Sequence, residues 1–350
     1  MRKKRVAICF SGVPFIKGGA ELCVESLARE LSQRGLAVEI VNLPFQWSPK
    51  QELIKNLVMW RLLNIKEFAG NQIDLVIATK FPSYVINHPN KVTWLFHQHR
   101  AIYDLYGTPF SDFEANNEED NKIREQIIRS DNKTLAESRT IYTIAQNTSN
   151  RLKYYNNLDS TPLYHPPKHY GKYHCQQYGD YILSVGRLEG LKRIDLLLRS
   201  LKHTDQQLKC IIAGTGGMEG DLKKLAQELG LEHRVKFLGF VKDEDLLKLY
   251  ANCKAVYFAP YDEDYGYITL EAFLSSKPVI TCKDSGGVLE FAEHNVNAYV
   301  ADIPEPALLG QYMNQLHNNP TAASELGNNG YVKVKDINWD HVITKLTEVI

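Results

Sequence analysis

The sequence lacks paired cysteines, and it also lacks any long apolar run. Its six cysteines are scattered, at positions 9, 23, 175, 210, 253 and 282, and no two of them form a C-x-x-C pair. This pattern argues against a disulfide framework and against a zinc site, and it predicts reduced thiols in a cytoplasmic protein. No apolar stretch is long enough to span a bilayer. The basic start of the chain is typical of a signal peptide, but the apolar run at 6–10 is too short for one, so we interpret it as the first buried strand.

The sequence also has no excess of positive or negative charge. The 41 Lys and Arg residues balance the 41 Asp and Glu residues, which gives a formal net charge of zero at pH 7. A neutral chain argues against nucleic acid as the main partner. With 350 residues the chain is long enough for two domains with separate cores, and its apolar and charged fractions are those of an ordinary globular protein.

Apolar runs alternate with helical patterns through both halves of the chain. Such alternation predicts βαβ units, which have parallel strands and right-handed crossovers. An irregular stretch at 158–178, rich in Pro, Tyr and His, is interpreted as a linker between the halves. We therefore predict an α/β fold with two doubly wound parallel sheets. The predicted strands lie at 6–10, 38–43, 74–79, 92–96, 136–144, 181–185, 209–213, 235–237, 255–259 and 279–282.

The stretch at 50–69 is rich in apolar residues and also carries Lys55, Arg61 and Lys66. We expect one helix here, packed on the core of the first half. The alternative is a helix that makes a peripheral contact with a membrane surface or borders an acceptor cleft.

The stretch at 260–273 combines two carboxylates with a helix start. The first helical residues should be Gly266, Tyr267 and Ile268. Backbone N–H groups at a helix start lack an intrahelical partner and lie at the positive end of the helix dipole, so they bind anions. Glu263 lies on the loop before the helix and Glu271 in its second turn, so two carboxylates and a phosphate-sized anion site would line one crevice. The alternative is a solvated acidic loop that caps a helix.

Cations, glycines and a histidine follow other predicted strands. Arg187 and Lys192 come after the strand at 181–185 and are suited to a diphosphate. His97 follows the strand at 92–96, at the end of the sheet where open α/β folds bind ligands. Each feature alone has a plain alternative, a solvated basic loop or a tight turn. Glycines that would let a ligand approach the backbone are Gly18, Gly19, Gly186, Gly214 and Gly216.

Taken together, these turns resemble the nucleotide-sugar glycosyltransferases of family 4, which have the GT-B fold. The resemblance covers nearly the whole chain, and its most specific part is the E-x(7)-E pair together with the Arg and Lys of the G-R-x(4)-K run. One departure is Asp264–Tyr265, which replaces the usual Gly-Phe and would alter the shape of the pocket. The matching residues are Gly18, Gly19, Glu21, His97, Gly186, Arg187, Lys192, Gly214, Gly216, Glu263 and Glu271.

The resemblance implies two Rossmann-like domains that face each other across a cleft. Residues 1–165 would form the acceptor-binding domain, and residues 166–337 the domain that binds the nucleotide-sugar donor. The family's crossover implies that a C-terminal helix within 338–350 packs back on the first domain. An apolar stripe of Val342, Ile343 and Leu346 at helical spacing supports this expectation.

The resemblance also implies a reaction. A hexose would move, with retention at the anomeric carbon, from a UDP- or GDP-sugar to a saccharide or lipid-linked saccharide acceptor in polysaccharide biosynthesis. No cofactor or metal would be needed, and the protein would be cytoplasmic, with contact to the inner face of the plasma membrane as an option. The resemblance implies that the diphosphate is bound by Arg187 and Lys192 and the donor sugar by Glu263 and His97. The ribose would be bound by Glu271 and the base by Phe240.

Other functions were weighed against this one. A glycoside hydrolase also uses two carboxylates but would not need Arg187 and Lys192. A nicotinamide dehydrogenase would need a G-x-G-x-x-G fingerprint, and the spacing at the glycine turns does not fit it. A sugar-nucleotide epimerase of the same fold and a non-catalytic sugar-nucleotide-binding protein stay open as alternatives.

Overall fold

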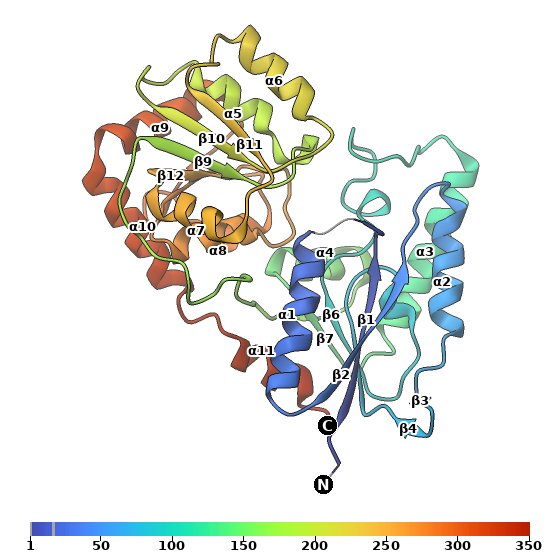
Figure 1. Cartoon of the computed structure of the whole chain (residues 1–350). Coiled ribbons are helices and arrows are strands. Elements are labelled where there is room, and N and C mark those ends of the chain that lie inside the picture. The colour runs from blue at the N-terminus through green and yellow to red at the C-terminus, as the bar shows by residue number, and fades with distance from the viewer. Residues whose placement is uncertain (1, 16–17) are drawn as a thin grey trace. The chain divides into compact units, whose positions relative to one another are not determined.

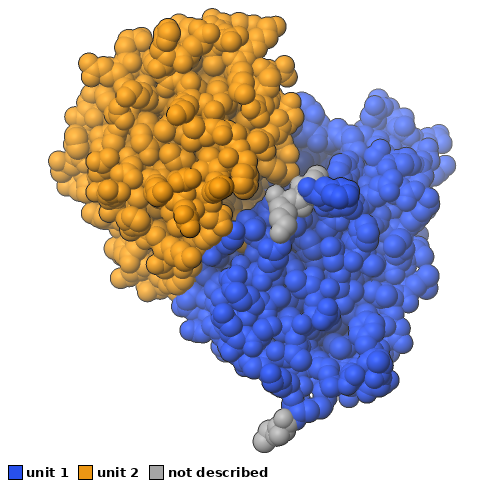
Figure 2. All heavy atoms as spheres, in the orientation of Figure 1, with its two compact units in different colours: residues 1–168, 338–350 blue, residues 169–337 orange. Residues whose placement is uncertain are grey.

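The computed structural model describes residues 2–15 and 18–350 of the chain (Figure 1). The chain divides into two compact units, which have different colours in Figure 2. Residues 1–168 and 338–350 form unit 1, and residues 169–337 form unit 2. Each unit has its own sheet and its own apolar core.

Unit 1 is built on a six-stranded parallel sheet with the strand order β2-β1-β5-β6-β7-β8. The central strands are almost completely buried apolar runs, as expected where helices cover both faces of a parallel sheet. The strands are β1 (Arg5–Gly12), β2 (Ala37–Pro44), β5 (Leu75–Ala78), β6 (Lys91–Leu95), β7 (Thr140–Thr143) and β8 (Thr161–Pro162).

Helices pack on both faces of this sheet. On one face, α2 and α3 lie side by side, and their apolar side chains join Ala7 and Cys9 of β1 in one core (Figure 1). On the other face lie α1 and α11. The helices of unit 1 are α1 (Gly19–Gln33), α2 (Gln51–Leu62), α3 (Glu118–Leu135), α4 (Gln146–Asn156) and α11 (Trp339–Thr347), with the 3₁₀ turns η1 (Ser83–Val85) and η2 (Arg100–Ile102).

The C-terminal helix α11 belongs to unit 1, although it follows unit 2 in the sequence. Trp339 is buried, and its ring stacks on His165 and meets Trp94 edge-on, with centroids 5.9 and 6.3 Å away. The apolar stripe of α11, which includes Val342, is buried as well. At the surface, Arg34 at the end of α1 forms an ion pair with Asp340.

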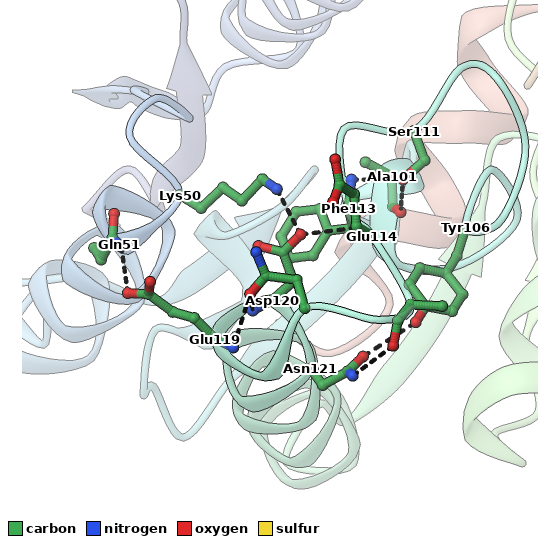
Figure 3. Close-up of polar contacts among 12 residues, drawn as sticks. Lys50, Gln51, Ala101, Tyr106, Ser111, Phe113, Glu114, Glu119, Asp120 and Asn121 are labelled. Atoms are coloured by element: carbon green, nitrogen blue, oxygen red, sulfur yellow. Dashed lines mark hydrogen bonds and ion pairs between the residues drawn. The ribbon is translucent and has the colours of Figure 1, made fainter.

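The long loop between η2 and α3 is tied to the starts of α2 and α3 by polar contacts (Figure 3). Asp120 accepts hydrogen bonds from the Lys50 ammonium at 2.6 Å and from the Glu114 backbone N–H at 2.7 Å. Asn117 caps α3, because its side chain accepts hydrogen bonds from the N–H groups of the first turn. Lys50 also lies 4.8 Å from the centre of the Phe113 ring. The loop that follows β6 is therefore held in a fixed shape.

Unit 2 has a second six-stranded parallel sheet with the order β11-β10-β9-β12-β13-β14. The order reverses between β9 and β12, and in open sheets this switch point is where ligands bind. The strands are β9 (Tyr181–Val185), β10 (Lys209–Ala213), β11 (Val235–Gly239), β12 (Ala255–Tyr257), β13 (Val279–Cys282) and β14 (Ala298–Ala301).

In unit 2, α5, α6 and α9 cover one face of the sheet, and α7 and α8 lie on the other (Figure 1). The predicted fold class, two doubly wound parallel sheets, is confirmed. The helices of unit 2 are α5 (Ile194–Leu201), α6 (Glu219–Glu228), α7 (Asp243–Asn252), α8 (Tyr267–Leu274), α9 (Pro306–Asn318) and α10 (Pro320–Val334), with the 3₁₀ turns η3 (Gly190–Lys192) and η4 (Gly287–Glu290).

One prediction about the elements of unit 1 was wrong. The helix expected at 50–69 ends at Leu62, because the backbone of Leu63 is extended. The chain then forms a small antiparallel hairpin, β3 (Glu67–Phe68) and β4 (Asn71–Gln72), whose turn places Ala69 and Gly70 at positive φ. No helix in the described part of the chain has the length and apolar character that crossing a membrane requires.

Candidate functional site

Three loops at the carboxyl ends of β9, β12 and β13 are joined by backbone hydrogen bonds. The N–H of Tyr261 donates to the carbonyl of Leu191 at 2.8 Å, which links the loop after β12 to the loop after β9. The N–H of Asp262 donates to the carbonyl of Asp284, and that of Gly287 to the carbonyl of Glu263, at 2.8 and 2.7 Å. Residues 186–193, 260–266 and 284–287 thus form one connected surface at the switch point of unit 2.

Lys192 and Glu263 form an ion pair in this surface. Both side chains are partly exposed, and the Lys192 ammonium also lies 5.7 Å from the centre of the Phe258 ring. Arg187 is more exposed, with 54% of its side chain accessible, and donates to Glu189 at 2.8 Å. The structure therefore brings the predicted cations and the first predicted carboxylate to the same set of loops.

Arg193 was not among the predicted site residues, although it is the third cation of the same run. Its guanidinium forms two hydrogen bonds with Asp284, both at 2.7 Å, and also donates to the carbonyls of Ala259 and Pro260 at 2.7 Å each. Burial lowers the pKa of Arg193, but the hydrogen bonds to Asp284 outweigh it and hold that pKa above its usual value. Arg193 thus fastens the loop after β9 to the ends of β12 and β13.

The glycines at 214 and 216 allow two loops to pack closely. A Cβ atom at Gly214, which has φ +142°, would lie 1.8 Å from the carbonyl oxygen of Gly186. A Cβ at Gly216 would lie 2.4 Å from the carbonyl oxygen of Leu188. Gly186 itself has φ +134°, a conformation that side chains with a Cβ rarely adopt. These glycines therefore support the loop that carries Arg187, whereas the sequence suggested approach by a ligand.

The predicted helix start is at the predicted place. Gly266 is the N-cap of α8 with φ +80°, and a Cβ there would lie 3.1 Å from a methyl group of Val288. Tyr267 and Ile268 are the first helical residues and are half-buried. Their backbone N–H groups belong to the first turn, which is suited to an anion.

Glu271 lies in the second turn of α8 and is half-buried. Its Oε2 accepts a hydrogen bond of 2.6 Å from the Tyr250 hydroxyl of α7. Burial raises the pKa of Glu271 to about 7, although the Tyr250 hydrogen bond acts in the opposite direction. This carboxyl therefore changes charge near neutral pH.

Phe240 lies at the turn between β11 and α7 and is 81% exposed. It lines an open hollow of about 560 Å³ together with residues of the first turns of α7. An exposed aromatic ring beside a hollow is suited to a flat ligand group such as a nucleobase. The other lining residues are Leu238, Val241, Lys242, Asp245, Lys248 and Leu249.

Three predicted residues lie in unit 1. Gly18 and Gly19 begin α1 after β1, and the Gly18 N–H donates to the Glu21 carboxylate at 2.9 Å. The loop before Gly18 lies in part outside the described residues, at 16–17. His97 follows β6, and its Nδ1 lies 2.8 Å from the Gln98 carbonyl. Two residues further on, His99 is half-buried among aromatic rings, and loss of solvent lowers its pKa to about 4.

Lys80 is a candidate that the sequence analysis missed. It is the second residue after β5, at the switch point of unit 1, and is buried. Its ammonium lies 3.4 Å from the Glu21 carboxylate and 4.4 Å from the centre of the Phe10 ring. The sequence feature that could have indicated it is a lysine at the end of an apolar run. A charged residue is uncommon at a buried strand end, so this feature alone did not predict a site residue.

Within residues 2–15 and 18–350, no three His, Cys, Asp or Glu side chains gather in a group that could hold a metal ion.

Comparison with known proteins identifies the second half of the chain. Residues 175–333 match the family model described as Glycosyl transferases group 1. This segment is similar to the group 1 glycosyl transferases. It spans most of unit 2, including Arg187, Lys192, Glu263 and Glu271.

Sequence relatives match part of the chain. An uncharacterized glycosyltransferase of Methanocaldococcus jannaschii is 38% identical over 118 residues, which are 33% of this chain and 30% of that protein. An alpha-1,3/1,6-mannosyltransferase of Mus musculus is 29% identical over 44% of this chain and 40% of its own length. The O-antigen chain mannosyltransferase C of Escherichia coli is 28% identical over 47% of this chain and 44% of its own length. The chain thus covers less than half of each relative.

Solved structures match the whole fold. HepE from Anabaena, in complex with UDP and glucose, has a TM-score of 0.72 at 19% identity and covers 98% of both chains. The sucrose-phosphate synthase of Thermosynechococcus elongatus has a TM-score of 0.79 at 16% identity, over 99% of this chain and 98% of that one. WaaG, a glycosyltransferase involved in lipopolysaccharide biosynthesis, has a TM-score of 0.72 at 14% identity, over 98% of this chain and 99% of its own. These neighbours are GT-B glycosyltransferases, so the likeness confirms the GT-B fold class.

Proposed function

We propose that the protein is a retaining glycosyltransferase that moves a hexose from a UDP- or GDP-sugar to a saccharide or lipid-linked saccharide acceptor in polysaccharide biosynthesis. The observation that carries the proposal is the surface at the switch point of unit 2. There a cation pair, a carboxylate and a helix start lie on hydrogen-bonded loops. The family match over 175–333 supports it, as do the mannosyltransferases among the relatives and the UDP bound to HepE.

The reaction needs positive charge at the leaving group. When the bond between the anomeric carbon and the phosphate oxygen breaks, negative charge grows on the diphosphate, and preorganised donors stabilise it. Arg187, Lys192 and the N–H groups at Gly266–Ile268 would supply that charge. The acceptor hydroxyl would attack the same face of the anomeric carbon, and its proton would pass to the leaving phosphate oxygen. In this proposal no metal or cofactor takes part.

The other predicted residues bind the donor in this proposal. Glu263 would accept hydrogen bonds from the sugar hydroxyls, and Glu271 from the ribose hydroxyls. Phe240 would lie against the base. His97 of unit 1 would contact the donor sugar, and Gly18 and Gly19 would leave room for the diphosphate or the acceptor.

Nucleotide binding is the first test. A screen of thermal unfolding with UDP and GDP should raise the midpoint with one of them, because a ligand that binds only the native state stabilises it by mass action. Nucleotide release from the matching sugar donors should then rise when a saccharide acceptor is added. Release that stays the same with every acceptor would contradict transfer, and a changed sugar on the intact nucleotide would indicate the epimerase alternative.

The configuration of the product tests retention. The anomeric proton of the transferred sugar should show, by NMR, the same configuration as the donor. Activity should also be unchanged after treatment with a chelator, and loss of activity that an added divalent cation restores would contradict the metal-independent mechanism.

A further inference from the structure

We propose that Tyr250 is a positioning residue for Glu271, which it holds so that the second carboxylate oxygen accepts the hydroxyl groups of a ribose. The inference rests on the proposed function, because it assumes a nucleotide ligand. It adds a residue from α7 to a site whose predicted members lie on α8 and on the loops after β9, β10, β11 and β12 in unit 2.

The geometry at Glu271 gives its two oxygens different tasks. Oε2 accepts the 2.6 Å hydrogen bond from Tyr250, a short distance for such a bond. The hydroxyl of Tyr173 also acts on the Glu271 carboxylate and favours its ionised form. The side chain is half-buried, and in this proposal Oε1 is the atom that accepts the ligand. A carboxylate with one oxygen fixed and one accessible is preorganised, and binding then costs less side-chain entropy.

Tyr250 is suited to this task because it is itself rigid. It is one of the largest fully buried side chains, and the ring of Tyr173 meets it edge-on with centroids 6.0 Å apart. Burial raises the pKa of Tyr250 well above its usual value, so the hydroxyl keeps its proton and donates it to Glu271. Sequence patterns gave no sign of this role, since Tyr250 lies 21 residues before Glu271 and looks like a core residue of α7.

The groups that face Glu271 determine how its charge responds to pH. Burial raises its pKa to about 7, and Asp243 of α7 acts in the same direction. Tyr250 and Tyr173 act in the opposite direction, because hydroxyl donors favour the ionised form. Asp243 in turn lies 3.3 Å from the His169 ring nitrogen. The helix α10, which also packs on α8, meets it at Phe273 and so away from this carboxyl.

This arrangement gives a pH dependence with a defined sign. Ribose hydroxyls donate hydrogen bonds, so the ligand prefers the ionised carboxylate. Nucleotide affinity should therefore rise as the pH increases through about 7, and binding near this pH should release protons. Removing the Tyr250 hydroxyl takes away a group that favours ionisation. The pKa of Glu271 then rises further, and the affinity rise moves to higher pH.

The test compares Tyr250→Phe with the wild type by calorimetric titration of UDP and GDP between pH 6 and pH 9. We expect the variant to bind about tenfold more weakly at pH 6.5 but within about threefold of the wild type at pH 9, since one pH unit below the pKa corresponds to a tenfold loss of the ionised form. Phosphate titration of the ligand is common to both proteins and cancels in the comparison.

Tyr181→Phe is the matched control. Tyr181 is a half-buried tyrosine of the same unit, and its hydroxyl donates to the carbonyl of Leu249 in α7 at 2.8 Å. Its loss should leave the pH profile unchanged. Glu271→Gln should flatten the profile altogether, because the titrating group is gone. The 2′-deoxy nucleotide should show a smaller difference between Tyr250→Phe and the wild type.

The possible failures can be told apart. If the wild type binds neither UDP nor GDP at any pH, the proposed function is wrong. If the wild type binds but Tyr250→Phe weakens affinity by the same factor at every pH, or not at all, the positioning role is wrong while the proposed function stands. A thermal midpoint measured for each variant shows whether it is folded in the titration.

Discussion

At the level of single residues, the two predicted phosphate-binding cations are held in different ways. Lys192 is paired with Glu263 and partly buried, so its position is fixed before any ligand binds. Arg187 is exposed, and it forms an ion pair with Glu189, two positions along the same loop. An exposed ion pair of this kind contributes little to stability. Arg187 can therefore turn toward a diphosphate at small cost to the fold.

Replacing Arg187 by alanine should reduce transfer by about 100- to 1,000-fold, because one preorganised charge donor at a developing anion is worth about 2.7–4 kcal/mol. The thermal midpoint should stay close to that of the wild type, since the side chain is 54% exposed. Arg199→Ala, at an exposed arginine on α5, is the matched control and should leave transfer unchanged. Transfer by Arg187→Ala near the wild-type rate would contradict the role in diphosphate binding.

Residue spacing predicted part of the site. It could not distinguish a ligand-binding residue from an adjacent residue that holds the loops together. Arg187, Lys192 and Arg193 read as one basic run in the sequence. In the structure Arg193 adopts φ +49°, which directs its side chain to Asp284 and to two strand-end carbonyls. A conformation of that kind depends on the loops that close around it, so composition alone does not reveal it. The same holds for Tyr250, whose partner comes from another helix.

At the level of elements, strands were easier to predict from the sequence than helices. The central strands are short, mostly apolar runs and appear in the structure close to the expected bounds. The sequence pattern predicted no element for α9 or α10. In α10, Gly327 and Gly330 weaken the local helix signal, since glycine destabilises a helix by about 1 kcal/mol relative to alanine.

The packing of α10 on α8 explains these glycines. A Cβ at Gly327 would lie 2.0 Å from the carbonyl oxygen of Ser276, and one at Gly330 would lie 2.3 Å from a ring atom of Phe273. The helix can therefore approach α8 only where a side chain is missing. Here tertiary packing overrides local helix propensity.

Gly327→Ala should lower the free energy of unfolding by about 1–3 kcal/mol, the usual cost of overpacking a tight contact, even though alanine favours helices. Gly220→Ala in α6 is the control, because a Cβ there meets nothing within 4 Å. That variant should be unchanged or more stable by up to about 1 kcal/mol. The measurement is chemical unfolding followed by circular dichroism. Equal effects of the two substitutions would show that the contact with Ser276 does not limit the approach of α10.

At the level of the whole molecule, the chain contains two separate cores and passes between them twice, near 168 and near 337. The two-sheet α/β fold could be predicted because each half repeats the same alternation of strands and helices. The boundary region could not be drawn from periodicity, because residues 158–178 have none. Burial of Trp339 against His165 and Trp94 assigns the last helix to unit 1, which local pattern alone does not determine.

Two separate cores lead to a prediction about where a nucleotide stabilises the protein. The predicted donor-binding residues other than His97, Gly18 and Gly19 lie in unit 2, so a nucleoside diphosphate should protect amides of that unit first. At a ligand concentration of 100 times Kd the stabilisation is about 2.7 kcal/mol, which slows exchange through unfolding of unit 2 about 100-fold. Hydrogen exchange with mass spectrometry should locate the protection at 181–193 and 255–274, with little change in β1, β5 and β6.

The variant Arg187→Ala at the same ligand concentration should lose most of this protection. Protection confined to residues 2–15 and 18–168 would instead place the nucleotide on unit 1 and overturn the assignment of unit 2 as the donor-binding part of the chain.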